Sequence, residues 1–256
     1  FSPGDFQISD KLYLELFSNW CGKTADNKCL PPWFLDLSQK QLGVLLSSIF
    51  SGDGYVSSQE VALTSKSRQL ISQLSYALLR FGIVSRIREK YRRATNTPDS
   101  EKKLYFEIII SGQDNLKKYT KNIGFSLKRK QEKLSELLSL KKKPNTNVDL
   151  IPLSGNSFKE FRLAHNLSQL ELASKIRCTR SHISLIENGI RLPSANLIRR
   201  LVSIYKPEFK NLLNMFWTPI NRIELFSNIN DDYVYDISVA DNETFVAGFG
   251  GLFVHN

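Results

Sequence analysis

The sequence has few cysteines and no long apolar run. Its 256 residues include only three cysteines, Cys21, Cys29 and Cys178, at scattered positions. An odd, scattered set fits neither a disulfide framework nor the spacing of a zinc site, so we expect buried thiols. No apolar run reaches the roughly 20 residues that span a bilayer, and "FSPGDF" lacks the basic start and apolar stretch of a signal peptide. These absences predict a soluble, cytoplasmic protein with no membrane partner.

The chain is globular in composition, and its positive charge is concentrated in two blocks. With 41% hydrophobic residues and this length, we expect two domains or one domain with an insertion. The net charge is +10. Residues 102–143 hold twelve Lys and Arg against four acids, a difference of +8, and residues 151–216 hold ten against four, a difference of +6. Residues 217–256 hold one Arg against six acids, a difference of −5. A solvated face explains any single cluster, but two such blocks favour a nucleic-acid partner.

The stretch "LSQKQLGVLLSSIFSGDG" predicts a helix that ends on an acid. Apolar residues recur at helical spacing after a Ser38 cap, and Asp53 is followed by the helix breaker Gly54. Because the helix dipole disfavours a carboxylate at a C-terminus, an acid there invites a cation partner. A simple C-cap followed by a turn is the alternative. Small side chains along the helix would let a second helix approach closely: Gly43, Ser47, Ser48 and Gly52.

This segment resembles the LAGLIDADG motif of homing endonucleases, in the degenerate form "LLSSIFSGDG". "NKCLP" before it resembles the entry of the second repeat in that family. After it, "YVSSQEVALTSKS" predicts a hairpin, Arg68 to Phe81 a helix, "GIVSRIREKY" with "KLYFEIIIS" a second hairpin, and "NLKKYTKNIGF" a further helix. This order, αββαββα, is that of one LAGLIDADG repeat, which the resemblance places at residues 28–143.

The resemblance also implies a site. In the family, two motif helices pack face to face, their terminal acids bind Mg²⁺, and the sheets form a saddle in the major groove of DNA. Asp53 would then be a catalytic residue and the Mg²⁺ ligand, and Lys28 would stabilise charge at the scissile phosphate, with Lys66 as a weaker candidate for the same role. Only one motif helix is visible, and residues 1–27 look like the end of a preceding repeat.

The second basic block predicts an all-α helix-turn-helix domain at residues 151–216. A cap at Ser168 begins one helix, "CTRS" leads into a second, and Gly189 stops it. The block resembles the lambda-repressor and Cro type, notably in "SQLELA" and "ISLIENG", and the resemblance implies a recognition helix from about Arg180 to Asn188. A helical bundle used for protein contacts is the alternative. The implied DNA-binding residues are Gln169 on the backbone, then Arg180, Ser181, His182, Ser184 and Arg191.

The last segment, residues 217–256, predicts a hydrophobic hairpin with strands at Val234 to Val239 and Leu252 to Val254 around the glycines of "AGFGG". The stretch "VYDISVADNETFVAGFGGLFVHN" resembles the last two splicing blocks of an intein, in the form common among archaeal inteins, and implies the hairpin of a Hint-type splicing fold. Asn256 would cyclise to a succinimide and release the following segment. His255 would polarise the carbonyl or protonate the leaving amine, and Asp236 would orient the junction. Splicing needs no cofactor.

The other end departs from the intein pattern. An intein begins with Cys or Ser and carries a Thr-x-x-His block, and Phe1 starts neither. The interpretation is therefore an α+β protein that forms the C-terminal part of an intein. Its expected partners are a double-stranded DNA target, an N-terminal intein half in the same precursor or a separate chain, and the flanking host segments. The alternatives are a free-standing endonuclease without splicing, and a sequence-specific DNA-binding protein with a decayed nuclease.

Overall fold

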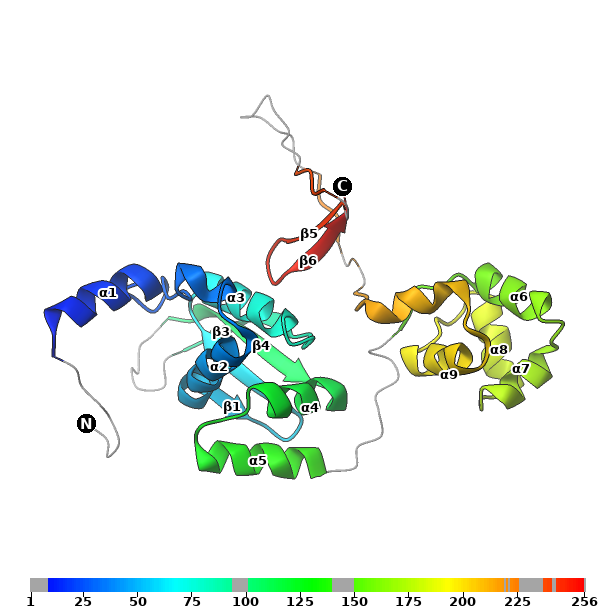
Figure 1. Ribbon diagram of the computed structural model, residues 1–256, viewed down its shortest axis with the longest axis horizontal. Helices are drawn as coiled ribbons and strands as arrows, with labels where there is room; N and C mark the ends of the chain where they lie inside the picture. The colour runs from blue at the N-terminus through cyan, green and yellow to red at the C-terminus, as the bar shows by residue number, and fades with distance from the viewer. Residues whose placement is uncertain are drawn as a thin grey trace. The chain divides into compact units, whose positions relative to one another are not determined.

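The structure is a computed structural model that describes residues 9–93, 101–139, 150–218, 220, 222–225, 237–240 and 243–255. The chain divides into two compact units (Figure 1). The first, here unit 1, comprises Phe1–Lys142 and Asp232–Asn256, and the second, unit 2, comprises Lys143–Asp231. None of the described helices has the length and apolar character needed to cross a membrane.

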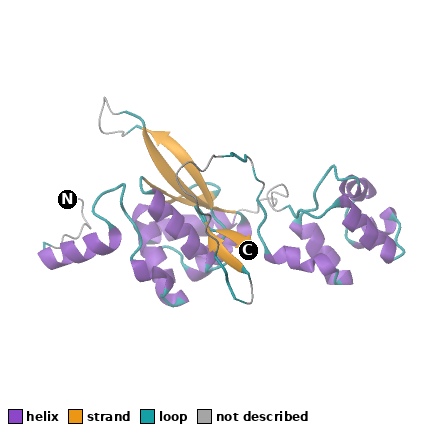
Figure 2. Ribbon diagram, turned by 90° about the horizontal axis from the view of Figure 1, so that it is seen from above, coloured by secondary structure: helices purple, strands orange, loops and turns teal. Residues whose placement is uncertain are grey.

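Unit 1 is built on a four-stranded antiparallel sheet with the strand order β1-β2-β4-β3. Figure 2 shows that its two long strands run past the helices at one end. The strands are β1 (Gly54–Val56), β2 (Glu60–Ser65), β3 (Arg86–Arg92) and β4 (Lys103–Ser111). The helices are α1 (Lys11–Cys21), the 3₁₀ turn η1 (Pro32–Leu35), α2 (Gln39–Asp53), α3 (Arg68–Leu79), α4 (Gln113–Asn122) and α5 (Lys128–Ser139). From α2 to α4 this is the predicted αββαββα order, whereas α1 and α5 were not predicted.

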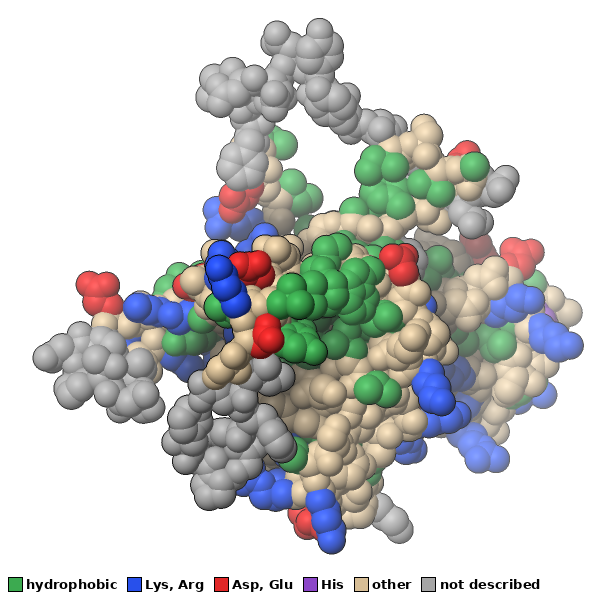
Figure 3. Space-filling view, turned by 60° about the vertical axis from the view of Figure 1, so that its left-hand side comes forward, with side chains coloured by type: hydrophobic (Ala, Val, Ile, Leu, Met, Phe, Trp, Pro, Cys, Tyr) green, Lys and Arg blue, Asp and Glu red, His purple; other side chains and the backbone are tan. Residues whose placement is uncertain are grey.

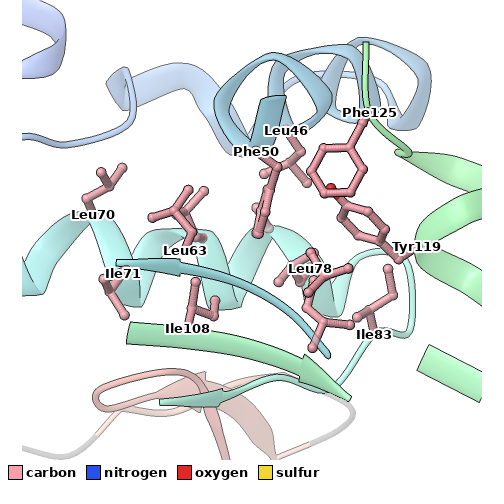
Figure 4. Packing of buried hydrophobic residues seen from close by; sticks show 14 of the residues in the cluster. Leu46, Phe50, Leu63, Leu70, Ile71, Leu78, Ile83, Ile108, Tyr119 and Phe125 are labelled. Carbon is pink, nitrogen blue, oxygen red and sulfur yellow. The ribbon is translucent and has the colours of Figure 1, made fainter. Parts of the chain in front are cut away.

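The core of unit 1 lies between the helices and one face of the sheet. Alternate residues of β2 and β4 point to this face, because successive side chains of a strand point to opposite sides. Phe50 of α2 packs edge-to-face on Tyr119 of α4, with ring centroids 5.5 Å apart. Figure 4 shows how α2, α3 and the strands converge on this cluster. Its fully buried members include Leu42, Leu46, Leu63, Ile71, Leu74, Leu78, Ile83 and Ile108.

The C-terminal hairpin forms, with one of its two predicted strands in place. The structure pairs β5 (Thr244–Ala247) with β6 (Leu252–His255). The strand at Leu252 to Val254 is confirmed as part of β6. Residues 237–239 lie in no strand, and residues 234–236 fall outside the described part of the chain. The prediction of a strand across Val234 to Val239 was therefore wrong for residues 237–239. The reason is the turn: Gly248, Gly250 and Gly251 all have positive φ, which reverses the chain tightly enough to pair the segments directly beside them.

The turn of this hairpin packs on α3 within unit 1 (Figure 1). Ser75 Oγ donates a hydrogen bond of 2.7 Å to the Gly250 carbonyl, and Tyr76 Oη donates one of 2.8 Å to the Gly248 carbonyl. Phe249 packs edge-to-face on Phe106 at 6.0 Å, and the guanidinium of Arg68 lies 4.0 Å from its ring centroid. Because Phe106 points into the core, the hairpin turn lies on the helix side of the sheet.

Unit 2 is a bundle of short helices. They are α6 (Gly155–Ala164), α7 (Gln169–Lys175), α8 (Arg180–Glu187), α9 (Ala195–Tyr205) and the 3₁₀ segment η2 (Glu208–Asn214). Each of the four α-helices starts at a side-chain cap, and Ser168 with Glu171 forms a full capping box at α7. Phe158, Leu172, Ile183, Ile186, Ile198 and Leu201 are fully buried in the shared core. The predicted helix-turn-helix therefore forms between α7 and α8.

Candidate nucleic-acid interface

The helix α2 presents its terminal acid at one end of the sheet. Ser38 caps the N-terminus with a capping box, and Asp53 is the last helical residue before Gly54. The Lys28 ammonium lies 3.7 Å from Asp53 Oδ2, with both side chains more than half exposed. Ser67 Oγ donates a hydrogen bond to the Lys28 carbonyl, whereas the ammonium of the neighbouring Lys66 lies 6.0 Å from the ring centroid of Tyr105. Of the three residues predicted for cleavage chemistry, the structure thus brings Asp53 and Lys28 together.

Lys130 of α5 holds the C-terminal end of α2. Its Nζ donates to the carbonyls of Ser51 at 2.6 Å and Gly52 at 3.1 Å, and to that of Gly54. The last carbonyls of a helix have no intrahelical partner, so one ammonium here replaces several missing bonds. Burial, together with Arg129, lowers the pKa of Lys130, and the negative charge of Asp53 opposes this shift. Lys28 therefore places one cation beside Asp53, and Lys130 places another at the main-chain carbonyls of the same helix end.

Asp53 is the residue predicted to bind Mg²⁺, and it offers one exposed carboxylate. No cluster of three or more His, Cys, Asp or Glu side chains occurs within the ranges that the structure describes. Mg²⁺ needs several oxygen ligands in octahedral geometry, whereas Asp53 offers one carboxylate whose nearest recorded ionic partner is an ammonium. Among the described residues no set of three such ligands surrounds Asp53, so Mg²⁺ binding at this helix end stays a prediction.

The predicted small residues of α2 divide into two sets. Gly43 faces inward, where a Cβ would lie 2.6 Å from the Asn122 carbonyl oxygen, and Ser47 Oγ lies 3.2 Å from Ser126 Oγ. Ser48 and Gly52 are exposed, and no atom lies within 4 Å of the Cβ position of Gly52. Val44, four residues before Ser48, has 63% of its surface exposed. Val44, Ser48 and Gly52 therefore form an open stripe that fits a second helix. Figure 3 shows exposed hydrophobic side chains gathered on one face of the molecule.

The sheet face opposite the helices is strongly basic, and the sequence reasoning missed it. Residues at every second position of β3 point to this face, since their intervening neighbour Ile87 packs toward the core. The signal for this face is the period-two pattern in "RIREKYR", in which Arg and Lys alternate with other residues. We call this surface the basic face, and define it by Tyr55, Glu60, Thr64, Arg86, Arg88, Lys90, Arg92 and Glu107.

A buried carboxylate lies in the middle of the basic face. The Glu107 side chain has no exposed surface. Its Oε1 accepts from Lys90 Nζ at 2.6 Å, Tyr55 Oη at 2.8 Å and Thr64 Oγ1 at 3.1 Å, while Arg88 Nε donates to Oε2. Burial alone would raise the pKa of Glu107, but these hydrogen bonds lower it to about 2. Glu107 is therefore ionised at neutral pH.

In unit 2, several residues predicted to contact DNA reach the surface of α8 and its surroundings. Arg180, Ser181 and Arg191 are exposed, and Ser184 is partly exposed. His182 behaves differently, because its Nε2 is buried with no hydrogen-bond partner among the described residues. Burial, followed by the charges of Arg191 and Arg200, lowers the pKa of His182. In this conformation His182 does not present Nε2 to a ligand.

Gln169 joins a buried ion pair that lies behind α8. Arg162 Nε donates to Glu187 Oε1 at 2.6 Å, and its terminal nitrogen donates to Oε2 at 3.0 Å. Gln169 Nε2 donates to Glu187 Oε2 at 2.8 Å. Burial would raise the pKa of Glu187, but the bonds from Arg162 and Gln169 lower it. This network links α6, α7 and α8, so it fixes how α8 lies against the rest of the unit.

The structure says little about the residues predicted for splicing. Asp236 and Asn256 lie outside the described residues, and of His255 only the backbone is described, in β6. Glu243 has a positive φ of 48° just before β5. The roles of Asp236, His255 and Asn256 therefore remain predictions.

Parts of several known proteins are similar in sequence to this chain. A Replication factor C small subunit of Methanocaldococcus jannaschii is 34% identical over 141 residues, which are 55% of this chain and 7% of that protein. In the same organism, the Probable translation initiation factor IF-2 is 31% identical over 71% of this chain and 14% of its own length. The DNA-directed RNA polymerase subunit Rpo1C is 26% identical over 98% of this chain and 29% of its own length.

This chain thus spans less than a third of each of these relatives. The family model of the LAGLIDADG-like domain matches residues 41–124, which run from α2 to the end of α4. The helix-turn-helix model matches residues 158–206, which include α7 and α8. The chain contains a LAGLIDADG-like domain and a helix-turn-helix domain.

Proposed function

We propose that this chain is part of an intein that combines site-specific DNA cleavage for homing with C-terminal splicing chemistry. One observation carries the proposal. The chain is similar to short stretches of three proteins from one organism whose names assign them to replication, translation and transcription. A segment common to proteins of such different names is not part of any activity that they share. It is the pattern expected of an inserted element that moves between host genes.

The geometry supports a nuclease that acts on double-stranded DNA. LAGLIDADG-like and helix-turn-helix domains indicate DNA binding and endonuclease activity. The basic face supplies cations on a sheet that lies beside the Asp53 end of α2, and unit 2 supplies a second basic element. A second repeat would pack on the stripe of Val44, Ser48 and Gly52 and bring the second carboxylate. Mg²⁺ would bind between the two acids, with Lys28 and Lys66 close to the phosphate.

DNA binding should weaken steeply with salt and should depend on both units. Each phosphate contact contributes about −0.9 to the slope of log K against log salt concentration. We expect Arg88→Ala in unit 1 and Arg180→Ala in unit 2 each to reduce the slope by about 1. The measurement is fluorescence anisotropy with a random-sequence duplex over a range of salt concentrations, with Lys11→Ala on α1 as the control. A flat salt profile of the wild-type chain would rule out the nucleic-acid role of the basic blocks.

Splicing is the second function, and the glycine-turned hairpin β5–β6 next to the His-Asn sequence favours it. The Asn256 side-chain nitrogen would attack the main-chain carbonyl of the same residue. The peptide bond to the next residue would break, its nitrogen would leave as an amine carrying the proton, and an aminosuccinimide would remain.

Asn256→Ala should therefore prevent release of a segment fused behind Asn256 in the complete precursor. The check is mass spectrometry of the released segment and of the new C-terminus, which in the wild type should be one water lighter than a free asparagine end. Asn242→Ala, a nearby asparagine, serves as the control. Release that continues unchanged in Asn256→Ala would refute the role of Asn256, and a wild type that releases nothing would favour a free-standing endonuclease.

A further inference from the structure

An acid in the middle of a phosphate-binding surface needs an explanation. Glu107 lies on β4, one of the two inner strands of the sheet, and it points to the basic face. A carboxylate at that position would repel DNA if it were exposed. Instead it has no exposed surface, because Tyr55, Thr64, Arg88 and Lys90 cover it. The negative charge of Glu107 therefore binds neighbouring side chains of the protein and does not face the solvent.

The contacts of Glu107 connect all four strands. In register, Glu107 lies directly opposite Thr64 of β2 and Arg88 of β3, so these side chains start close together. Tyr55 reaches the same carboxylate from β1. Lys90, two positions after Arg88, donates to the oxygen that Tyr55 and Thr64 also use. One side chain therefore sets the positions of polar groups from the other three strands.

Arg88 still has exposed hydrogen-bond donors after it binds Glu107. Arg88 uses Nε for Glu107, and 48% of its side chain remains exposed. One oxygen of the Glu60 carboxylate lies 3.8 Å from Nη2 of Arg88, and its other oxygen lies 3.8 Å from Nη2 of Arg86. A long side chain that is already held in one geometry loses less conformational entropy when it binds. A planar guanidinium held in one orientation can also distinguish base edges, which a freely moving charge does less well.

We propose that Glu107 is a positioning residue for DNA recognition, which holds Arg88, Lys90 and Tyr55 in place so that the basic face discriminates between base sequences. This inference rests on the proposed function, because it assumes that the basic face contacts double-stranded DNA. Glu107 itself does not touch the DNA. Without it, Arg88 and Lys90 keep their charges but lose their fixed positions.

The test is Glu107→Gln against the matched control Glu89→Gln. Both changes remove one negative charge, but Glu89 is exposed and alternates with Arg88 and Lys90 on β3, so it points to the other face. Binding of the full chain to a random-sequence duplex should become tighter in Glu107→Gln, since an acid has left the basic face. The affinity ratio between duplexes selected by the wild type and random duplexes should fall about tenfold. Glu89→Gln should keep the wild-type ratio.

A cycle of variants shows whether Glu107 acts through the two cations. In an Arg88→Ala and Lys90→Ala background, Glu107→Gln should cause no further loss of sequence preference. Tyr55→Phe removes one donor to Glu107 without changing charge, and should lower the preference by a smaller factor. Thermal unfolding measured for every variant shows whether it folds. If Glu107→Gln does not fold, the sequence preference of Tyr55→Phe is the test of the proposal.

Two results separate the possible failures. Wild-type preference in folded Glu107→Gln, or in Tyr55→Phe if the first does not fold, would overturn the positioning role while leaving the proposed function intact. A wild-type chain that shows no preference for any duplex, or whose preference survives removal of both Arg88 and Lys90, would instead refute DNA recognition by the basic face.

Discussion

Asp53→Asn should abolish double-strand DNA cleavage by the complete protein and leave DNA binding unchanged. The Asp53 side chain is 60% exposed, and its ion pair with Lys28 spans 3.7 Å between exposed groups. Such surface pairs contribute little to stability, so the neutral amide should not disturb the fold. Lys130 holds the end of α2 through main-chain carbonyls and remains in place. The substitution therefore removes the negative charge at the end of the motif helix and nothing else.

Cleavage is measured on supercoiled plasmids that carry duplexes selected by the wild-type protein, and binding is measured on the same duplexes. Asp26→Asn, which changes another exposed acid near Lys28, is the control and should cut normally. Continued nicking or cutting by Asp53→Asn would exclude a catalytic role for Asp53. A wild type that binds these duplexes and cuts none of them would point to the second alternative, a DNA-binding protein with a decayed nuclease.

Glu187→Ala should destabilise unit 2 by about 3–5 kcal/mol, because it leaves the buried guanidinium of Arg162 without its counterion. Only 9% of the Arg162 side chain and 3% of the Glu187 side chain are exposed, so water cannot replace the lost partner. Gln169 loses its acceptor at the same time. A domain of this size has a total stability of only about 5–15 kcal/mol. We therefore expect a large fraction of unit 2 to unfold.

Hydrogen exchange followed by mass spectrometry localises the effect. Peptides from residues 155–205 should lose protection, whereas peptides from residues 41–124 should keep it, since the two segments lie in separate compact units. Glu160→Ala, an exposed acid on α6, should leave both regions unchanged. The double change Arg162→Met and Glu187→Leu should be less destabilising than Glu187→Ala, because no unpaired charge stays buried. Equal protection in Glu187→Ala and the wild type would refute the structural role of the pair.

The sequence by itself determined the elements whose signals are local. Ser38 and Ser168 cap α2 and α7 through hydrogen bonds to residues three positions away. The local sequence is therefore sufficient to predict where both helices begin. Strand alternation and turn residues likewise predicted the order from α2 to α4. The resemblance then identified Asp53 and Lys28, which the structure places 3.7 Å apart.

Only the tertiary structure decided the pairings between residues that are distant in the sequence. Lys130 caps α2 across 76 to 80 positions, and Arg162 pairs with Glu187 across 25. The basic face could have been read from the alternation in β3, but nothing local marks Glu107 as the acid in its centre. The hairpin turn packs on α3 through Ser75 and Tyr76, more than 170 positions before it. Periodicity and capping act over a few residues, whereas burial of a charge depends on which strands the fold brings together.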